Sequence, residues 1–389
     1  MTRQFLNSMS RRQHALLITG ICLIAVLLSV GLIQEIRIPQ KRISSVSTHM
    51  TIRQIAPKLG VTGKALAREL ALPLNANKHK PLNEMGIRHE RLMHVVNHLI
   101  GHRSSPIKYY LFSALVLWGW LFLTQIGRPE KMGLNQRKGW YPRLGYIIPL
   151  LVSVIVAGFL LGKSPNPMEG AVKVFKSMVG LYPHVWEKIA ALAFFILLAV
   201  VGNKLICGWA CPFGALQELI NTLPLFKKIK RHKLPFTVTN AIRVALFLTM
   251  LLLLFGVVGG KKGFVIYHYI NPFDLFNLDV EAASILMTII AALGVSLFFY
   301  RPFCQFICPF GLLSWMVERF SFYRVTIDMA ACTHCGACAK ACPLPAMAGR
   351  LNESLFPADC FSCGRCLNVC PVDAVKYAKS GKSLIAPRS

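Results

Sequence analysis

The chain has 389 residues, of which 54% are hydrophobic and 15% are charged, and its mean hydropathy is +0.50. Soluble domains carry roughly a quarter charged residues, so this composition excludes an ordinary soluble domain and indicates a membrane protein that contacts lipid. The net charge of +28 does not indicate a nucleic-acid partner, because Lys and Arg stand between apolar runs, where membrane topology places them.

Six apolar runs are predicted to cross a hydrocarbon core of about 30 Å as helices. They cover residues 15–32, 109–126, 144–162, 189–206, 241–259 and 282–300. Asn203 and Lys204 interrupt the last turn of the fourth run and lead directly into a cysteine motif, so we expect the interruption to belong to a site. The fold class predicted from these runs is an α-helical polytopic membrane protein with about six transmembrane helices.

The Lys and Arg content of the loops predicts the orientation of the helices. The loop 128–143 carries five of these residues and the segment 204–243 carries seven, more than the alternate loops carry. Because cytoplasmic loops have an excess of Lys and Arg, these two segments are predicted to face the cytoplasm. An even number of spans then places both termini in the cytoplasm.

The segment 34–108 lies outside the cytoplasm in this topology and is predicted to form helices at 51–59, 62–72 and 87–102. Pro57 weakens the first of these helices, since proline breaks a helix interior. His94, His98 and His102 recur at every fourth residue and lie on one face of the third helix. Such a stripe can bind a metal or haem, but it is more often the polar face of an amphipathic helix.

Twelve of the 13 cysteines fall into four tight clusters, and Cys22 stands alone within the first apolar run. The C-terminal tail carries Cys-x2-Cys-x2-Cys-x3-Cys-Pro twice, the bacterial ferredoxin run, in which three cysteines hold one [4Fe–4S] cluster and the fourth holds the other. One predicted ligand set is therefore Cys332, Cys335, Cys338 and Cys370, and the other is Cys360, Cys363, Cys366 and Cys342. Zinc sites use four ligands in pairs, so this doubled pattern argues against zinc.

A second group of cysteines belongs to two Cys-x3-Cys-Pro-Phe-Gly motifs, each at the cytoplasmic end of a predicted span. Its members are Cys207, Cys211, Cys304 and Cys308. A step of four residues places both thiols of a pair on one helical face, and a repeated hairpin would bring the two pairs together. Four thiolates would complete a site for a third iron–sulfur cluster or another metal. The alternatives are packing cysteines, a redox disulfide and separate attachments.

The chain is thus predicted to divide into five segments. Residues 1–33 form an N-terminal cytoplasmic tail and the first transmembrane helix, and 34–108 form a small helical extracytoplasmic domain. Residues 109–320 form a five-helix membrane domain that carries both Cys-x3-Cys-Pro motifs. Residues 321–378 form a double [4Fe–4S] domain of the α+β bacterial ferredoxin type, and 379–389 form a tail.

The paired motifs, together with the double ferredoxin run after the last span, resemble the NapH/NosR group of membrane polyferredoxins over residues 109–378. The resemblance implies that all the motif cysteines bind clusters and that the protein lies in the bacterial inner membrane. Members of that group resemble quinol dehydrogenases or electron-donating subunits of periplasmic reductases. Quinone is therefore an expected cofactor, and a periplasmic reductase, a cytochrome or a ferredoxin-like protein is an expected partner.

The sequence predicts a membrane-bound electron-transfer subunit, part of a quinol dehydrogenase, that passes electrons to or from a respiratory reductase complex. One alternative is a maturation or regulatory factor that reduces a metal centre in another enzyme. Another is a cluster-bearing membrane sensor. No catalytic residue is predicted, and the sequence shows no Rossmann glycine fingerprint, P-loop or nucleophilic triad.

Overall fold

The fold is known from a computed structural model. It describes residues 46–59, 63–70, 72, 77–101, 107–126, 143–162, 164–181, 185–222, 232–258, 263–277, 283–352, 354 and 358–379. The first predicted span, residues 15–32, and Cys22 lie outside the described residues. The predicted tail 379–389 also lies outside them, apart from its first residue.

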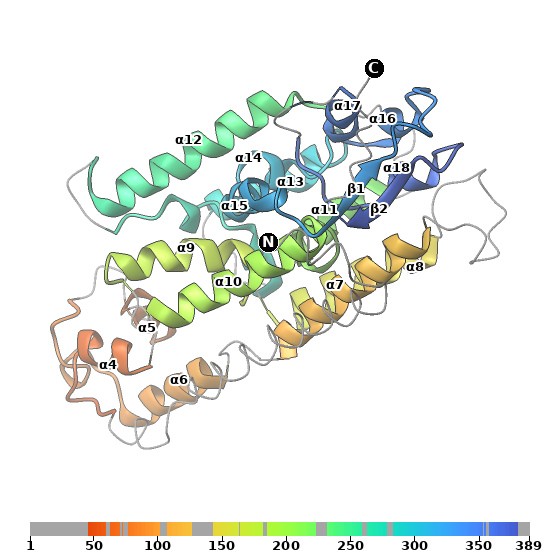
Figure 1. Ribbon diagram of the computed structural model, residues 1–389. Coiled ribbons are helices and arrows are strands. Elements are labelled where there is room, and N and C mark those ends of the chain that lie inside the picture. The colour runs from red at the N-terminus through yellow and green to blue at the C-terminus, as the bar shows by residue number, and fades with distance from the viewer. Residues whose placement is uncertain are drawn as a thin grey trace, which may run out of the picture.

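The centre of the molecule is a helical bundle in which α7, α10 and α12 run alongside one another (Figure 1). Its elements are α7 (Ile107–Ile126), α8 (Arg143–Val152), the π-helix η3 (Ser153–Leu160), α9 (Pro167–Met178), α10 (Val185–Gly202), the π-helix η4 (Ile206–Ala210), α11 (Pro212–Thr222), α12 (Phe236–Phe255), η6 (Ile266–His268), η7 (Pro272–Asn277), α13 (Ala283–Val295), α14 (Pro302–Phe306) and α15 (Pro309–Glu318).

Three helices among the described residues are long and apolar enough to cross a membrane. They are Ile107–Gln125, Val185–Gly202 and Phe236–Phe255, which overlap the second, fourth and fifth predicted spans. Shorter apolar helices at Gly145–Leu160 and Ala283–Val295 occupy the third and sixth. The chain is therefore a mostly helical membrane protein, and the count of six spans stays a prediction.

Two predicted spans extend further in sequence than the helices that form there. The fourth ends at Gly202 instead of residue 206, because Asn203 and Lys204 adopt left-handed backbone angles of φ 55° and 63°. The sixth ends at Val295 instead of residue 300. There Phe299 pairs with His232 in an isolated bridge, and Arg301 turns the chain at φ 47°. Both helices thus stop where a Cys-x3-Cys-Pro motif begins.

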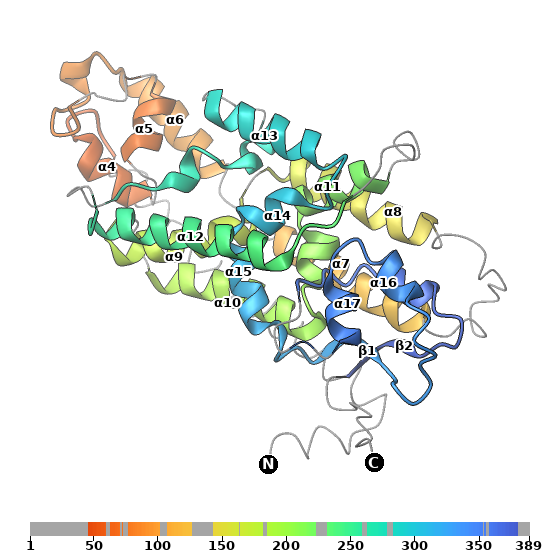
Figure 2. The same ribbon diagram turned by 90° about the horizontal axis from the view of Figure 1, so that it is seen from above.

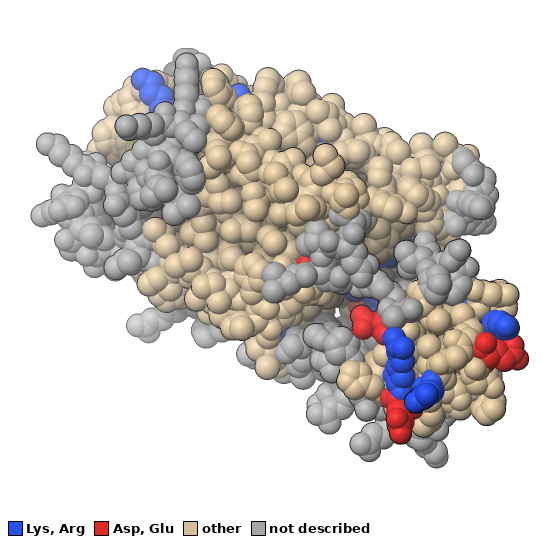
Figure 3. Space-filling view, turned by 180° about the vertical axis from the view of Figure 1, so that it is seen from behind, with Lys and Arg blue, Asp and Glu red and all other residues tan. Residues whose placement is uncertain are grey.

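The bundle surface carries few charges. Exposed apolar side chains include Leu121, Leu151, Leu252 and Ile290. Figure 3 shows a broad face without described Lys, Arg, Asp or Glu, and the charged residues that it does show gather toward the ends of the molecule. A contiguous apolar surface of this kind suits a protein whose helices face lipid.

A small helical unit with its own core lies at one end of the bundle, opposite the cysteine-rich tail (Figures 1 and 2). It consists of α4 (Ile52–Leu59), α5 (Gly63–Glu69), η1 (Asn83–Met85) and α6 (His89–Gly101). Helices α4, α5 and α6 lie within the predicted ranges 51–59, 62–72 and 87–102, and η1 lies between the last two. Pro57 stands inside α4, where we expected a break. The helix persists because Ile52, Ile55 and Leu59 are buried against the rest of the unit.

The tail folds into a compact domain of short helices and one two-stranded sheet, as expected for a ferredoxin-like α+β domain. Its elements are β1 (Tyr323–Ile327), α16 (Ala337–Ala341), α17 (Ala346–Leu351), α18 (Arg365–Asn368) and β2 (Val375–Lys379). The strands pair antiparallel, with Tyr323 opposite Lys379. The Phe322 N–H and the Tyr377 hydroxyl donate to the carbonyls of Val200 and Gly202, both at 2.9 Å. The domain is therefore fixed to the end of α10.

Trp209 joins the bundle to this domain and is fully buried. Its ring packs edge-on against Phe122 and Tyr146, and its indole N–H donates to the Ser362 carbonyl at 3.1 Å.

We expect Trp209→Ala to lower the free energy of unfolding by about 3–5 kcal/mol, the usual loss for a buried aromatic side chain. Thermal unfolding in detergent measures the effect. Trp186→Ala is the control, because Trp186 is 80% exposed; equal shifts for both variants would contradict the prediction.

Candidate metal centres

The two ferredoxin runs adopt the same backbone turn around their second cysteine. His334 and Gly336 flank Cys335 at φ 53° and 70°, and Ser362 and Gly364 flank Cys363 at φ 48° and 76°. Left-handed residues of this kind direct successive N–H groups into one concavity, which is how protein backbones bind anions and iron–sulfur clusters. The strained Ser362 is held by its hydroxyl, which donates to the carbonyls of Gly202 and Asn203.

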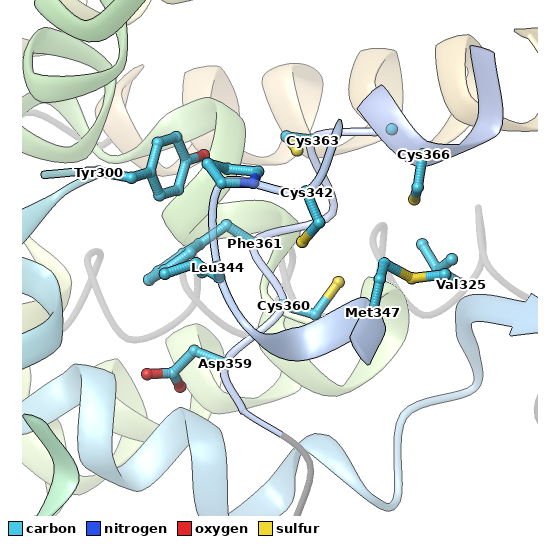
Figure 4. A pocket seen from close by; sticks show the side chains of 12 residues that line it. Tyr300, Val325, Cys342, Leu344, Met347, Asp359, Cys360, Phe361, Cys363 and Cys366 are labelled. Carbon is cyan, nitrogen blue, oxygen red and sulfur yellow. The ribbon is translucent and has the colours of Figure 1, made fainter. Parts of the chain in front are cut away.

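Four cysteines of the second ligand set surround one cavity. Cys342, Cys360, Cys363 and Cys366 line it with apolar neighbours that include Leu344 and Met347, and its empty space, including the open mouth, is about 350 Å³. Figure 4 shows their sulfur atoms around a shared space, with the Asp359 carboxylate directed away from it. The cavity thus brings together the residues that the ferredoxin spacing assigns to one cluster, and their role as its ligands stays a prediction.

The thiols of this set are buried close to one another. Burial raises the pKa of Cys360 and of Cys363 to about 11. Burial also raises the pKa of Cys366, and the nearby thiols of Cys342, Cys363 and Cys360 raise it further. Thiolates that repel one another in a dry site need a cation between them, which is what an iron–sulfur core supplies.

The first ligand set lies further out. Cys335 is exposed, Cys332 is partly exposed, and Cys338 and Cys370 are buried. Burial raises the pKa of Cys338, and the neighbouring thiols of Cys370 and Cys332 raise it further, so these three cysteines are close together. The backbone N–H of Ala337 lowers the pKa of the exposed Cys335 thiol. A cluster here would be the more solvent-accessible of the two.

The cysteines of the two Cys-x3-Cys-Pro motifs are also brought together. Burial raises the pKa of Cys308 well above its usual value, and the thiols of Cys304, Cys207 and Cys211 each raise it further. Gln217 of the first motif's helix α11 reaches the second motif, where its Nε2 donates to the Cys304 Sγ at 3.5 Å and its Oε1 accepts from the Phe303 N–H at 3.1 Å. The structure thus places the two motifs against each other. We call their four cysteines the four-thiol site, and their role as ligands of one cluster stays a prediction.

Among the described residues, no three His, Cys, Asp or Glu side chains stand close enough to hold one metal ion. The tail cysteines of the second set surround a cavity instead, with the turn geometry that suits an iron–sulfur cluster. Such a cluster, when bound, accepts and releases one electron at a time.

A buried basic residue precedes each motif by three positions and reaches across to the other motif. Lys204 precedes Cys207, and its Nζ donates to the Gly311 carbonyl at 3.3 Å. Arg301 precedes Cys304, and it donates to the carbonyls of Cys207 and Gly208. Both side chains are fully buried. This exchange of hydrogen bonds holds the two motifs together as a pair.

Buried carboxylates extend these contacts into the ferredoxin-like domain. Asp359, which precedes Cys360, accepts from Lys204 and, at 2.9 Å, from Arg243 of α12. Glu218 of α11 accepts from Arg301 at 2.9 Å and from Arg365 of α18. A third carboxylate, Glu318, lies 3.7 Å from Lys204 and 3.2 Å from Arg350. The network therefore joins residues beside the four-thiol site to residues beside the cavity cysteines.

Among the residues that the structure describes, the network carries more positive than negative groups. Its cations there are Lys204, Arg243, Arg301, Arg350 and Arg365, and its carboxylates are Glu218, Glu318 and Asp359. Buried charges are stable when opposite charges compensate them. Thiolate-bound iron–sulfur clusters are anionic, so clusters on both sides would supply the missing negative charge. The residues present therefore fit such clusters.

The sequence identified every cysteine but none of the carboxylates. Asp359, Glu218 and Glu318 look like ordinary charged residues in the sequence, and only their burial shows their role. One signal was available, because a basic residue stands three positions before the first cysteine of each motif.

Of the histidine stripe, the structure describes the side chain of His94, which is exposed. The side chain of His98 and all of His102 lie outside the described residues, so metal or haem binding there stays a prediction. His268 of η6 lies 2.7 Å from the amine of buried Lys176. The basic run 227–231 also lies outside the described residues.

Two families of iron–sulfur domains match the chain. The 4Fe-4S binding domain matches residues 186–232 and 281–324, which contain both Cys-x3-Cys-Pro motifs. The 4Fe-4S dicluster domain matches residues 324–371, which contain all the tail cysteines. No solved structure matches the chain.

Several curated proteins are similar to it. The uncharacterized protein MJ0749 of Methanocaldococcus jannaschii is 30% identical over 197 residues, which are 49% of this chain and 69% of MJ0749. YccM of Escherichia coli (strain K12) is 26% identical over 187 residues, 46% of this chain and 52% of YccM. The regulatory protein NosR of Stutzerimonas stutzeri is 29% identical over 152 residues, 38% of this chain and 21% of NosR. The chain thus spans only about half of YccM's length.

Apolar helices joined to two kinds of 4Fe-4S domain define a membrane-bound iron–sulfur electron-transfer protein. The chain belongs to the family of ferredoxin-type membrane proteins that includes NosR, MauN and YccM. The resemblance read from the paired motifs is therefore confirmed, as is the binding of [4Fe–4S] clusters.

Asp359→Asn tests the buried network. The variant removes the charge that compensates Lys204 and Arg243, and an uncompensated buried charge typically costs about 3–5 kcal/mol. We expect a matching loss of thermal stability in detergent. Glu84→Gln is the control, because Glu84 pairs with Lys80 at 3.8 Å on the surface, where such pairs contribute about 1 kcal/mol or less. An Asp359→Asn protein as stable as wild type would contradict the role of the network.

Glu218 predicts a pH dependence of stability. Burial opposes its ionisation, but Arg365 and Arg301 outweigh burial and lower its pKa from 4.5 to about 2. A lowered carboxyl pKa contributes stability above pH 4.5, and that stability is lost as the pH falls toward 2. The stability difference between wild type and Glu218→Gln should therefore shrink as the pH is lowered below 4.5. A difference that stays constant in acid would contradict the prediction.

Proposed function

We propose that the chain is a quinol-linked electron-transfer subunit that passes single electrons to or from a respiratory reductase complex in the bacterial inner membrane. The observation that carries this proposal is the continuous buried connection between the ferredoxin-like domain and the four-thiol site at the ends of the helices. Side-chain and backbone contacts join the neighbours of Cys360 to the neighbours of Cys207. Such a connection suits a relay that leads from a cytoplasmic domain into the membrane.

The exposure of the cysteines supports an order for the relay. Cys335 of the first set is exposed, whereas Cys342 and Cys366 of the second set are buried. The second set also adjoins the membrane domain, because the Asn203 amide donates to the Cys360 carbonyl at 3.3 Å. A soluble carrier would therefore meet the first cluster, and the second cluster would face the membrane.

The four-thiol site is proposed to hold a third iron–sulfur cluster. Support comes from the gathering of Cys207, Cys211, Cys304 and Cys308 and from the match of both motifs to a 4Fe-4S binding domain. The excess positive charge of the buried network would be compensated by such a cluster. Lys204, beside the first motif, donates to the second motif, and Arg301, beside the second, donates to the first. These reciprocal hydrogen bonds support one shared site over two separate ones.

The proposed orientation places the ferredoxin-like domain in the cytoplasm and the unit of α4–α6 outside it. Loop charge supports this assignment, and the two units lie at opposite ends of the bundle (Figure 2). A cleft beside Cys342 is lined by His232, Lys233 and Lys340. Its basic lining would favour an acidic electron carrier such as a ferredoxin-like protein. A periplasmic reductase or cytochrome would then bind on the opposite side of the membrane.

A second candidate function is a maturation or regulatory factor that reduces a metal centre of another enzyme. It is favoured by the relative NosR, which is named as a regulatory protein. The relay would be the same in both cases, and only the final acceptor would differ. A membrane sensor is the third candidate, and it would hold clusters without passing electrons continuously to an acceptor.

Quinol-dependent reduction tests the proposal. Purified protein in detergent or liposomes is mixed anaerobically with a quinol, and the clusters are followed by visible absorbance and electron paramagnetic resonance. We expect quinol to reduce the clusters of wild type at least tenfold faster than those of Cys207→Ser, since small losses of alignment or of a centre typically cost about one to two orders of magnitude in rate.

The Cys207→Ser variant also tests the proposed third cluster. Cys207→Ser should retain about eight iron atoms, the content of two [4Fe–4S] clusters, while wild type should contain more. Equal iron content in the two proteins would contradict a cluster at the four-thiol site. Wild-type clusters that no quinol reduces would contradict the quinol link and favour the regulatory function.

A further inference from the structure

A close backbone contact between the helical bundle and the ferredoxin-like domain lies beside the first Cys-x3-Cys-Pro motif. Gly208 follows Cys207 in η4, and a Cβ atom at Gly208 would stand 2.2 Å from the Phe361 carbonyl oxygen. The next residue, Trp209, donates its indole N–H to the Ser362 carbonyl at 3.1 Å. The segment that begins with a thiol of the four-thiol site therefore lies directly against the loop between Cys360 and Cys363.

Phe361 lines the cavity of the second cysteine set and also lies against two cations that bind the paired motifs. Its side chain is 2% exposed and leaves the loop on the side away from the Cys360 sulfur (Figure 4). Arg301 lies 5.1 Å and Lys204 lies 5.6 Å from the ring centroid, distances that favour attraction between a cation and an aromatic ring. Both cations also hold backbone carbonyls of the paired motifs, so the ring is fixed relative to the four-thiol site.

The two motifs differ at the position of this contact. The second motif has Gln305 where the first has Gly208, and Gln305 is buried, with its amide donating to the Tyr300 carbonyl. The second motif therefore accommodates a side chain where the first must approach the ferredoxin-like domain. Glycine allows two backbones to approach closely because it has no side chain. Gly208 therefore permits the first motif to approach Phe361 in a way that Gln305 would not permit at the matching position.

We propose that the Gly208–Phe361 contact is the electron bridge between the cavity cysteines and the four-thiol site, with Arg301 and Lys204 as its positioning residues. The inference rests on the proposed function, since it takes both sites to hold iron–sulfur clusters. Clusters held by the two cysteine sets would exchange one electron across this contact, so that one is oxidised as the other is reduced. No bond is formed or broken and no proton is transferred.

Gly208→Ala tests the bridge. The added methyl group must push the two backbones apart by at least about 0.8 Å, since real Cβ contacts lie beyond 3.0 Å and this one would be 2.2 Å. Electron tunnelling weakens with separation, so we expect transfer between the two clusters to slow several-fold. Magnetic interaction between the reduced clusters should weaken as well. Gly294→Ala is the matched control, because a Cβ there meets nothing within 4 Å.

The measurement uses the full-length protein with its clusters and a photochemical one-electron reductant, so it does not depend on quinol. Freeze-quench electron paramagnetic resonance follows each cluster and gives the transfer rate and the spin–spin interaction. Loss of quinol activity with normal intercluster transfer would contradict the proposed function but leave the bridge intact. Wild type without a paramagnetic centre at the four-thiol site would overturn the bridge, because the electron would have no acceptor.

Phe361→Leu provides a second variant in case Gly208→Ala loses its clusters. It removes the ring between Arg301 and Lys204 but keeps an apolar side chain of similar reach. We expect unchanged iron content and a several-fold slower intercluster rate. If either variant retains all clusters and transfers electrons at the wild-type rate with the wild-type spin–spin interaction, the contact is not the bridge.

Discussion

Buried pairing of charge between the helical bundle and the tail domain is the constraint on which the rest of this structure depends. Asp359 accepts from Lys204 and Arg243, and Glu218 accepts from Arg301 and Arg365, with all six side chains nearly or fully excluded from solvent. A buried ion pair is stable only when its geometry and its surroundings satisfy both charges. The tail domain therefore has one permitted position on the bundle, and that position brings Phe361 to Gly208.

The same cations also organise the membrane end of the molecule. Lys204 and Arg301 each stand three positions before one motif and donate to backbone carbonyls of the other. Each motif is therefore held in place by a residue from beside its partner. The left-handed backbone angles of Lys204 and Arg301 are strained for residues with a side chain. That strain is tolerated because the helices stop there and the buried carboxylates hold the side chains. The four thiols of the site are gathered as a consequence.

The two Cys-x3-Cys-Pro motifs are similar in sequence but differ in their contacts. Both motifs supply a pair of cysteines, a proline, a phenylalanine and a glycine, and both glycines, Gly214 and Gly311, pack closely on a cysteine carbonyl and an arginine. The first motif lies against the ferredoxin-like domain at Phe361 and Ser362, and there it has Gly208 where the second motif has Gln305. The first motif therefore both supplies two cysteines to the four-thiol site and contacts the tail domain.

The sequence by itself determined the membrane class, the cysteine motifs and most helix positions, because apolar runs and cysteine spacing are local patterns. It also placed Asn203 and Lys204 at a site, since a polar pair that interrupts an apolar run is visible without a structure. Only the tertiary structure decided that Glu218, Glu318 and Asp359 pair with buried Lys and Arg side chains, that α4 persists through Pro57, and that Gly208 meets Phe361. These features depend on burial and on contacts between residues far apart in the sequence, such as Lys204 with Asp359, which no local pattern encodes.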